Sequence, residues 1–167
     1  MTDSRRVHTV VDSPVGPLTL VAEDGDLVGL WMQGQAHRPP TTTFGPRRDE
    51  PFAEVTEQLA AYFDGRLTTF SVPVRLEGTR FQRAVWQALR DVPYGTTVSY
   101  GQLAASIGYP DAVRAVGAAN GRNPVPIVVP CHRVVASDGR LTGYSGGLDR
   151  KRWLLALEAG RPILPAA

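Results

Sequence analysis

Apolar side chains in the first quarter of the chain are spaced as in β-strands. Short runs rich in β-branched and apolar residues occupy positions 7–11, 18–22 and 27–31. Turn-forming residues separate these runs, with Pro and Gly within positions 13–17 and Asp and Gly within positions 24–26. This pattern predicts a three-stranded antiparallel meander.

A helix and one more strand are expected before residue 78. Residues 33–51 are rich in Pro, Thr, Gly and Arg, have no period and are expected to form a loop. The apolar residues from position 52 to 63 then follow helical spacing, and Gly65 lies where this helix would end. Residues 71–76 are predicted to form a strand. The expected boundary follows at Glu77 and Gly78.

The rest of the chain is expected to be mainly helical. Thr79 is the predicted N-cap of its first helix and Ser99 that of a second. Asp111 is the predicted N-cap of a third helix, which spans residues 112–120, and a last helix is expected to begin at Leu148.

The predicted fold class is therefore α/β in the α+β arrangement. An N-terminal supporting domain, residues 1–78, would consist of a small β-meander plus a helix. It would pack on a mainly helical C-terminal domain, residues 79–167.

Residues 99–120 have the proportions of a helix-turn-helix, with Gly108 at the break. Two short helices joined at a glycine also occur in proteins that never contact DNA, so both interpretations are open. The second helix has small side chains apart from Arg114, which suits close approach to a minor groove. The alternative for Arg114 is a surface ion pair with Asp111, three residues earlier.

Composition is that of an ordinary globular protein, with 43% apolar and 20% charged residues. No apolar run is long enough to cross a bilayer, and residues 1–10 lack the apolar core of a secretory signal, so a cytoplasmic location is expected. Residues 1–78 hold seven Arg and eleven Asp or Glu, a net charge of −4. Residues 79–167 hold eleven Lys or Arg and five Asp or Glu, a net charge of +6, which favours a polyanionic partner.

Cys131 is the only cysteine, which excludes an internal disulfide and a cysteine-rich zinc site. His8, His37 and His132 are widely spaced, so no structural metal is expected. A lone cysteine after an apolar segment is usually inert. His132 and Arg133 would favour a thiolate if they lay close, although an extended chain would point Cys131 and His132 to opposite faces. A nucleophile and an inert residue are both open interpretations.

Several blocks in the second half occur together and in a set order. Residues 130–135 read Pro-Cys-His-Arg-Val-Val. The other blocks are Pro-Tyr-Gly at 93–95, Ser-Tyr at 99–100, Arg-Ala-Val-Gly at 114–117, Asn-Pro-Val-Pro-Ile at 123–127 and Gly-Tyr-Ser-Gly-Gly at 143–147. This order resembles the O6-alkylguanine-DNA alkyltransferases, the methylated-DNA–protein-cysteine methyltransferases. The likeness is strong over residues 79–160, whereas the first half resembles the family's N-terminal domain only in outline.

The resemblance implies a set of catalytic roles. Cys131 would attack the alkyl carbon as a thiolate, and His132 would take the thiol proton through a water molecule. Glu158 would hold His132 in the right tautomer, as the acid of a triad does, and an exposed helix-end carboxylate is the alternative. Tyr100 would donate a hydrogen bond to guanine N3 as charge develops on the leaving base. Asn123 would join the turn after the recognition helix to the active-site segment.

The resemblance also implies residues that bind the base and the DNA. The Ser145 N–H would face guanine O6, Tyr144 would form a pocket wall, and Lys151 would lie near this pocket. Backbone around Val134 would read the guanine edge. The base would be flipped out of the duplex, and Arg114 would fill the vacated space. Further DNA contacts are expected from Ser99, Ala115, Gly117 and Arg133.

The activity implied is single-use repair of O6-alkylguanine in double-stranded DNA by a monomer that needs no cofactor, metal or membrane. O4-alkylthymine as a second substrate and cooperative binding on DNA are left open. The alternatives are a damage-binding relative without transfer, a helix-turn-helix transcription regulator and a cysteine hydrolase. The signature around Cys131 argues against the first, and the small-residue helix argues against the second. A hydrolase would need an oxyanion hole and repeated turnover.

Overall fold

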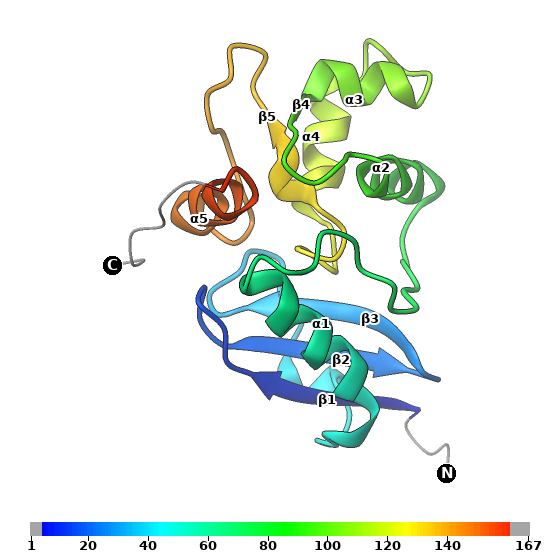
Figure 1. Ribbon diagram of the computed structural model, residues 1–167. Coiled ribbons are helices and arrows are strands. Elements are labelled where there is room, and N and C mark those ends of the chain that lie inside the picture. The colour runs from blue at the N-terminus through cyan, green and yellow to red at the C-terminus, as the bar shows by residue number, and fades with distance from the viewer. Residues whose placement is uncertain (1–4, 161–167) are drawn as a thin grey trace.

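The computed structural model describes residues 5–160 and combines a small antiparallel sheet with several helices (Figure 1). The sheet and helix α1 form one part, and helices α2 to α5 form the other. The predicted fold class is confirmed. The expected domains end in residues 1–4 and 161–167, which lie outside the described residues, and their boundary between α1 and α2 stays a prediction.

The predicted meander forms, with strand order β1-β2-β3 and antiparallel pairing throughout. Its strands are longer by one or two residues than the sequence pattern indicated. The elements of this part are β1 (Arg6–Val11), β2 (Leu18–Glu23), β3 (Asp26–Met32), the 3₁₀ turns η1 (Thr41–Thr43) and η2 (Glu50–Phe52), and α1 (Ala53–Phe63).

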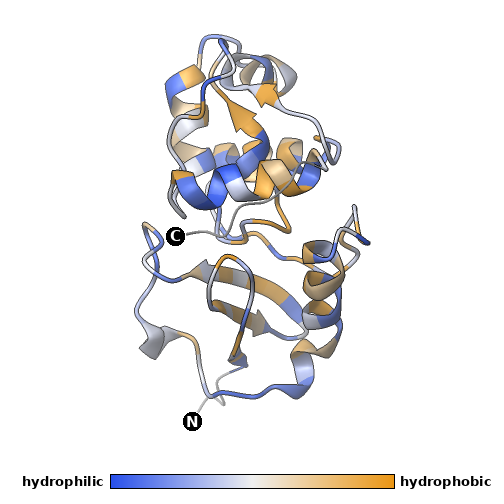
Figure 2. Ribbon diagram, turned by 60° about the vertical axis from the view of Figure 1, so that its left-hand side comes forward, coloured by the Kyte–Doolittle hydropathy of each residue, from blue (hydrophilic) through white to orange (hydrophobic). Residues whose placement is uncertain are grey.

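The central strand β2 is buried on both faces because different segments cover each face. Its even-numbered apolar residues share the main core with α1, which lies across one face of the sheet (Figures 1 and 2). Val21 points the other way, where it packs with Trp31 and with Phe44 from the long loop. The alternation of a strand thus places successive side chains in two separate clusters.

The strand predicted at residues 71–76 is wrong. This segment makes a single bridge to the edge of β3, between Val74 and Leu27. The Leu27 N–H donates to the Pro73 carbonyl at 2.9 Å and the Arg75 N–H donates to the Leu27 carbonyl at 3.0 Å, which completes one parallel bridge. Pro73 has no N–H with which to extend this pairing toward residue 71. A ladder therefore does not extend along the segment.

Two of the three predicted helix caps in the second part are confirmed. Thr79 and Ser99 each accept a hydrogen bond from a backbone N–H three residues later, and each closes a capping box with a glutamine. Asp111 is not a cap, because the N-cap is Ala112 and makes no side-chain hydrogen bond there. The elements are α2 (Arg80–Arg90), β4 (Val98–Ser99), α3 (Tyr100–Ser106), α4 (Val113–Gly121), η3 (Cys131–Arg133), β5 (Val134–Val135) and α5 (Leu148–Glu158).

The two parts share one hydrophobic core. Leu30 and Met32 of the sheet belong to the same buried cluster as Val125 and Ile127, which lead into the segment of Cys131. The Leu30 N–H also donates to the carbonyl of Pro124 at 2.8 Å. The sheet therefore supports the segment that carries the cysteine. No helix within residues 5–160 has the length and apolar character needed to cross a membrane.

Candidate active site

Cys131 lies at the start of a short 3₁₀ helix, η3, and the chain becomes extended after it in β5. Its side chain is 1% exposed and that of His132 is fully buried. Successive side chains in a 3₁₀ helix are rotated by about 120° instead of alternating between faces. The objection that Cys131 and His132 must point to opposite faces therefore does not apply.

His132 is held by Glu158, which lies at the last residue of α5. The Nε2 atom of His132 is 2.7 Å from Oε2 of Glu158. A neutral imidazole donates from one nitrogen and accepts at the other, so donation to the carboxylate leaves Nδ1 as the acceptor. Nδ1 is buried and has no hydrogen-bond partner among the described residues. It is therefore available to receive a proton.

Glu158 is buried, so its interpretation as an exposed helix-end carboxylate is wrong. Its side chain is 1% exposed. Besides His132, it accepts hydrogen bonds from Arg133 Nε at 2.7 Å, Arg133 Nη2 at 3.0 Å and the Tyr62 hydroxyl at 2.6 Å. Burial opposes its ionisation, but the hydrogen bonds from His132, Arg133 and Tyr62 outweigh burial and lower the pKa of Glu158 to about 2. The group is an anion at any physiological pH.

Arg133 is not a DNA contact, contrary to the prediction. Its side chain is 8% exposed, and its guanidinium binds Glu158 on one side and the carbonyl of Val92 at 2.7 Å on the other. The ring of Tyr94 lies 5.7 Å from the guanidinium carbon. A buried cation that is saturated by internal acceptors cannot reach a phosphate, so Arg133 instead balances the charge of Glu158.

Cys131 is a neutral thiol in the resting protein. Burial raises its pKa to about 11, although the Asn123 amide and the Lys151 ammonium act in the opposite direction. Arg133 does not help, because it faces Glu158. Burial also lowers the pKa of His132, and Glu158 offsets that effect only in part. A neutral thiol beside a neutral imidazole is a pair that can transfer a proton when the nucleophile is needed.

Two asparagines hold the segment that carries Cys131. The amide Nδ2 of Asn123 donates to the Val129 carbonyl at 2.7 Å, and its Oδ1 accepts from the Val125 N–H at 3.0 Å. Asn123 therefore links the turn after α4 to the segment that leads into Cys131. Asn120 on α4 was not predicted, and its amide donates to the Cys131 carbonyl at 3.3 Å.

A pocket of about 260 Å³ opens beside this segment. Its walls include Tyr100 and Gly117 from the helix-turn-helix, Asn120, and Tyr144 and Ser145 from the glycine-rich loop. The hydroxyls of Tyr144 and Ser145 are buried without a hydrogen-bond partner among the described residues. Burial and the neighbouring Cys131 raise the pKa of Tyr144, so its phenol is neutral. The pocket thus lies between the helix-turn-helix and the glycine-rich loop, and Asn120 joins it to the Cys131 carbonyl.

Lys151 ties the strand after Cys131 to the loop of the pocket. Its fully buried Nζ donates to the carbonyls of Val134 at 2.6 Å, Thr142 at 3.0 Å and Gly143 at 3.3 Å. Burial lowers its pKa. Lys151 therefore joins strand β5 to Thr142 and Gly143, which line the pocket, and its ammonium is directed at backbone oxygens.

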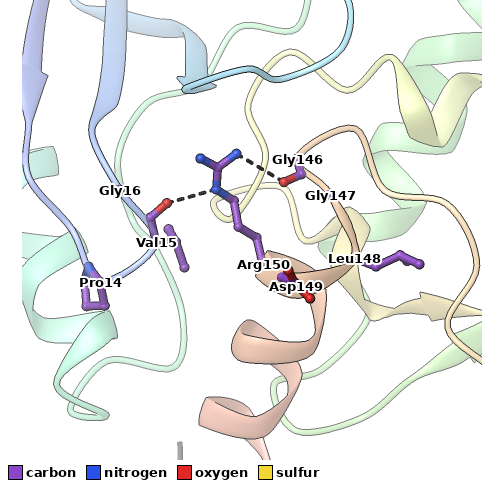
Figure 3. A pocket seen from close by; sticks show the side chains of 8 residues that line it. All are labelled: Pro14, Val15, Gly16, Gly146, Gly147, Leu148, Asp149 and Arg150. Atoms are coloured by element: carbon purple, nitrogen blue, oxygen red, sulfur yellow. Dashed lines mark hydrogen bonds between the residues drawn. The ribbon is translucent and has the colours of Figure 1, made fainter. Parts of the chain in front are cut away.

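Arg150 joins the same loop to the N-terminal sheet. Its guanidinium donates to the Val15 carbonyl at 2.9 Å and to the Gly146 carbonyl at 3.1 Å (Figure 3). A third bond reaches the Gln33 carbonyl at 2.8 Å. Gly146 packs so closely that an added Cβ would lie 2.6 Å from the sulfur of Met32. The N-terminal part therefore fixes the loop that forms a wall of the pocket.

The residues predicted to contact DNA, other than Arg133, lie around α3 and α4. Arg114 and Ala115 are exposed on α4, and among the described residues Arg114 has no ion pair with Asp111. Gly117 is half-buried against the ring of Tyr100. The Tyr100 hydroxyl donates to the Thr142 carbonyl at 3.1 Å, and the Ser99 side chain caps α3.

Tyr62, Asn120 and Arg150 contact the site but are not among the residues predicted for it. Asn120 shares the buried face of α4 with Val116 and Ala119, and a polar residue on an apolar face is a signal that could have identified it. Tyr62 follows the apolar spacing of α1 and reads as a core residue. Its contact with a carboxylate on another helix leaves no trace in the local sequence.

Side chains that could bind a metal ion do not cluster in the part of the chain that the structure describes. Within residues 5–160 no group of three or more His, Cys, Asp or Glu side chains could hold an ion.

Comparison with known proteins gives matches over nearly the whole chain. Residues 80–160 match the model of the 6-O-methylguanine DNA methyltransferase DNA-binding domain, and residues 7–76 match the ribonuclease-like domain of the same proteins. The chain is 55% identical over 153 residues to a methylated-DNA–protein-cysteine methyltransferase of Mycolicibacterium paratuberculosis, covering 90% of this chain and 91% of the relative. A protein of the same name from Methanosarcina acetivorans is 45% identical over 90% of this chain and 97% of its own length.

A solved structure shares the fold throughout. The Mycobacterium tuberculosis OGT, crystallised in complex with DNA, superposes with a TM-score of 0.88 at 49% identity, covering 96% of each chain. Both halves of the chain and the order of its elements are thus accounted for by one group of proteins. The chain belongs to the 6-O-methylguanine-DNA methyltransferase family, the methylated-DNA–protein-cysteine methyltransferases.

Proposed function

We propose that this protein repairs DNA by direct reversal, moving an alkyl group from O6 of guanine in duplex DNA to the sulfur of Cys131. The observation that carries the proposal is the buried group of Cys131, His132 and Glu158. In it, Nδ1 of His132 has no hydrogen-bond partner among the described residues. The family and its curated relatives support the same activity.

The reaction is a displacement at the alkyl carbon. The Cys131 proton passes to Nδ1 of His132 through a water molecule, and Glu158 stabilises the imidazolium that forms. The thiolate attacks the alkyl carbon, a carbon–sulfur bond forms, and the bond to guanine O6 breaks. Its electron pair stays on the guanine, which then takes up a proton. The thioether has no route back, so each molecule acts once and needs no cofactor.

The pocket beside Cys131 is the proposed site of the flipped-out guanine. The Tyr100 hydroxyl, which bonds the Thr142 carbonyl in the free protein, would turn to guanine N3. The Ser145 N–H would face O6, Tyr144 would stack as a wall, and backbone around Val134 would read the guanine edge. Lys151 would keep strand β5 and the loop in register around the base.

Duplex DNA is the proposed partner of the helix-turn-helix. The small residues Ala115 and Gly117 let the backbone of α4 approach a minor groove, and Ser99 lies at the adjacent start of α3. Arg114 would occupy the stack where the base has left. The protein would act as a monomer in the cytoplasm, with phosphate contacts from its basic half supplying affinity.

The proposal is tested by intact-mass analysis and peptide mapping after mixing the protein with duplex DNA that contains one O6-methylguanine. We expect the mass to rise by one methyl group in place of one hydrogen, with the added group confined to the peptide of Cys131 and with no further gain in excess DNA. Tight binding of the lesion without a mass gain would instead indicate a damage-binding protein, and a hydrolase would release product without a stable mass change.

Arg114→Ala should separate base flipping from chemistry. Without the side chain that fills the stack, transfer from duplex DNA should fall about tenfold or more, since unstacking a base costs a few kcal/mol. Reaction with the free base O6-benzylguanine, which needs no flipping, should stay within about twofold. Arg122→Ala, an exposed arginine that ends the same helix, is the control and should mainly weaken DNA affinity. Equal losses on both substrates for Arg114→Ala would exclude the flipping role.

A further inference from the structure

We infer that Tyr62, in the N-terminal part of the chain, is a positioning residue for alkyl transfer that sets the basicity of His132 through Glu158. The inference deepens the proposed function and rests on it. It gives the N-terminal part a share in the chemistry, beyond the supporting role expected from the sequence.

Three donors converge on the carboxylate of Glu158. The Tyr62 hydroxyl lies 2.6 Å from Oε2, the same oxygen that receives His132 Nε2 at 2.7 Å. Arg133 binds both oxygens from a further direction. Tyr62 comes from α1 and Glu158 from α5, 96 positions apart in the chain. The hydroxyl and the imidazole therefore compete for the electron density of one oxygen.

The hydroxyl proton stays on Tyr62 in this pair. Burial is the main reason that the pKa of Tyr62 is raised far above its ordinary value, and the adjacent Glu158 anion raises it further. The residue is fully buried, with its ring among Phe63, Phe70 and Tyr94. Tyr62 therefore acts as a neutral donor to a carboxylate throughout the pH range of the protein.

A purely structural account of the hydroxyl is incomplete. The charge of Glu158 is already balanced by Arg133, and a phenylalanine would fill the same space in the aromatic cluster. A buried hydroxyl is tolerated only when it is hydrogen-bonded, and here it meets the one carboxylate that orients His132. The charged or titratable groups that act on His132 and Glu158 come from four elements or their ends: Arg133 from η3, Lys151 from α5, Tyr94 after α2 and Tyr62 from α1.

The sign of the effect follows from charge. A donor on Oε2 withdraws part of the negative charge that would otherwise stabilise the His132 imidazolium. Tyr62 therefore keeps His132 less basic, so that the imidazole is neutral and ready to accept a proton over a wider pH range. Loss of the hydroxyl concentrates charge on Glu158 and makes His132 easier to protonate in the resting protein.

The test compares Tyr62→Phe with Tyr94→Phe. Both changes remove one hydroxyl from the same aromatic cluster, but no described hydrogen bond joins Tyr94 to Glu158. The rate constant of transfer from O6-methylguanine duplex is followed from about pH 5.5 to 9, where the wild-type rate should fall on the acid side as His132 is protonated. We expect Tyr62→Phe to move this acid limb upward by roughly half a pH unit, about threefold in rate on the limb. Tyr94→Phe should leave the limb in place.

A second readout does not depend on alkyl transfer. The chain has three histidines, so the ring nitrogens of ¹⁵N-histidine-labelled protein can be titrated by NMR and the His132 signal followed. The imidazole of His132 should titrate at higher pH in Tyr62→Phe than in the wild type. If the variant shows this shift but the wild-type protein transfers no methyl group, the proposed function fails, while the effect of Tyr62 on the basicity of His132 is retained.

Incorporation of 3,5-difluorotyrosine at position 62 keeps the hydroxyl and should shift the titration of His132 in the opposite direction to Tyr62→Phe. Fluorination makes the phenol a stronger donor, so the acid limb and the His132 titration should both move to lower pH. If Tyr62→Phe folds poorly, this variant still tests whether the hydroxyl controls the basicity of His132. A uniform loss of rate at every pH, an unshifted His132 titration, or the same shift in Tyr94→Phe would each overturn the inference.

Discussion

Cys131→Ser is expected to leave no alkylated protein after prolonged incubation with O6-methylguanine duplex, a loss of at least about 10⁴-fold in transfer rate. A hydroxyl in this buried position has a far higher pKa than a thiol, and His132 is a weak base that cannot remove its proton. Serine is smaller than cysteine and adds no charge, so the packing around residue 131 should change little. The measurement is intact mass against time.

Binding to the lesion should survive the same substitution. The substitution leaves unchanged the residues of α3 and α4 that we propose to contact DNA. The affinity of Cys131→Ser for damaged duplex, measured by fluorescence anisotropy at fixed salt, should therefore match that of the wild type within about threefold. Methyl transfer to any residue of the variant would refute the assignment of the nucleophile.

Glu158→Gln is expected to slow transfer by about 10²-fold or more, the usual contribution of a general acid–base system. Glutamine can still accept the Nε2–H bond of His132, so the imidazole keeps its orientation. It provides no negative charge to stabilise the imidazolium, and Arg133 stays beside the ring as an uncompensated cation. The acid limb of the rate should therefore move to lower pH, opposite to the change expected for Tyr62→Phe.

The matched control is Asp149→Asn on the same helix. Asp149 is exposed and pairs only with Arg152 among the described residues, at 3.2 Å, so its loss should leave the rate unchanged. An unaltered rate in Glu158→Gln, or an equal loss in Asp149→Asn, would remove Glu158 from the proton pathway.

Glu158→Gln should also lower stability, because breaking a buried ion pair costs about 3–5 kcal/mol. In the wild type the pKa of Glu158 is lowered to about 2, below its value in an unfolded chain. The carboxylate therefore stabilises the fold at neutral pH, and this contribution is lost as the pH falls toward 2. Thermal melts across acid pH should show that dependence in the wild type and a smaller one in the variant. Rates must be compared below the melting range of both proteins.

The sequence alone determined the elements whose signals are local. Alternating apolar runs and turn residues predicted the meander, and the threonine and serine that precede α2 and α3 predicted their N-caps. Local signals misled where one contact decided the outcome. A proline kept residues 71–76 from extending a ladder, and Ala112 occupies the cap position that Asp111 was expected to fill. The ordered blocks around Cys131 indicated the family, which the comparisons confirmed.

Only the tertiary structure decided what surrounds the nucleophile. Arginine commonly binds phosphate, yet in the folded protein the guanidinium of Arg133 points inward to Glu158. Glu158 looks like a solvated helix end, and Tyr62 looks like one more core aromatic. They meet because Tyr62 of α1 and the side chains of η3 converge on the carboxylate at the end of α5. Burial raises the pKa of Tyr62 and lowers that of His132, whereas hydrogen bonds lower the pKa of Glu158. Local sequence specifies which groups are present, whereas desolvation and pairing across long chain separations determine their charge and their role.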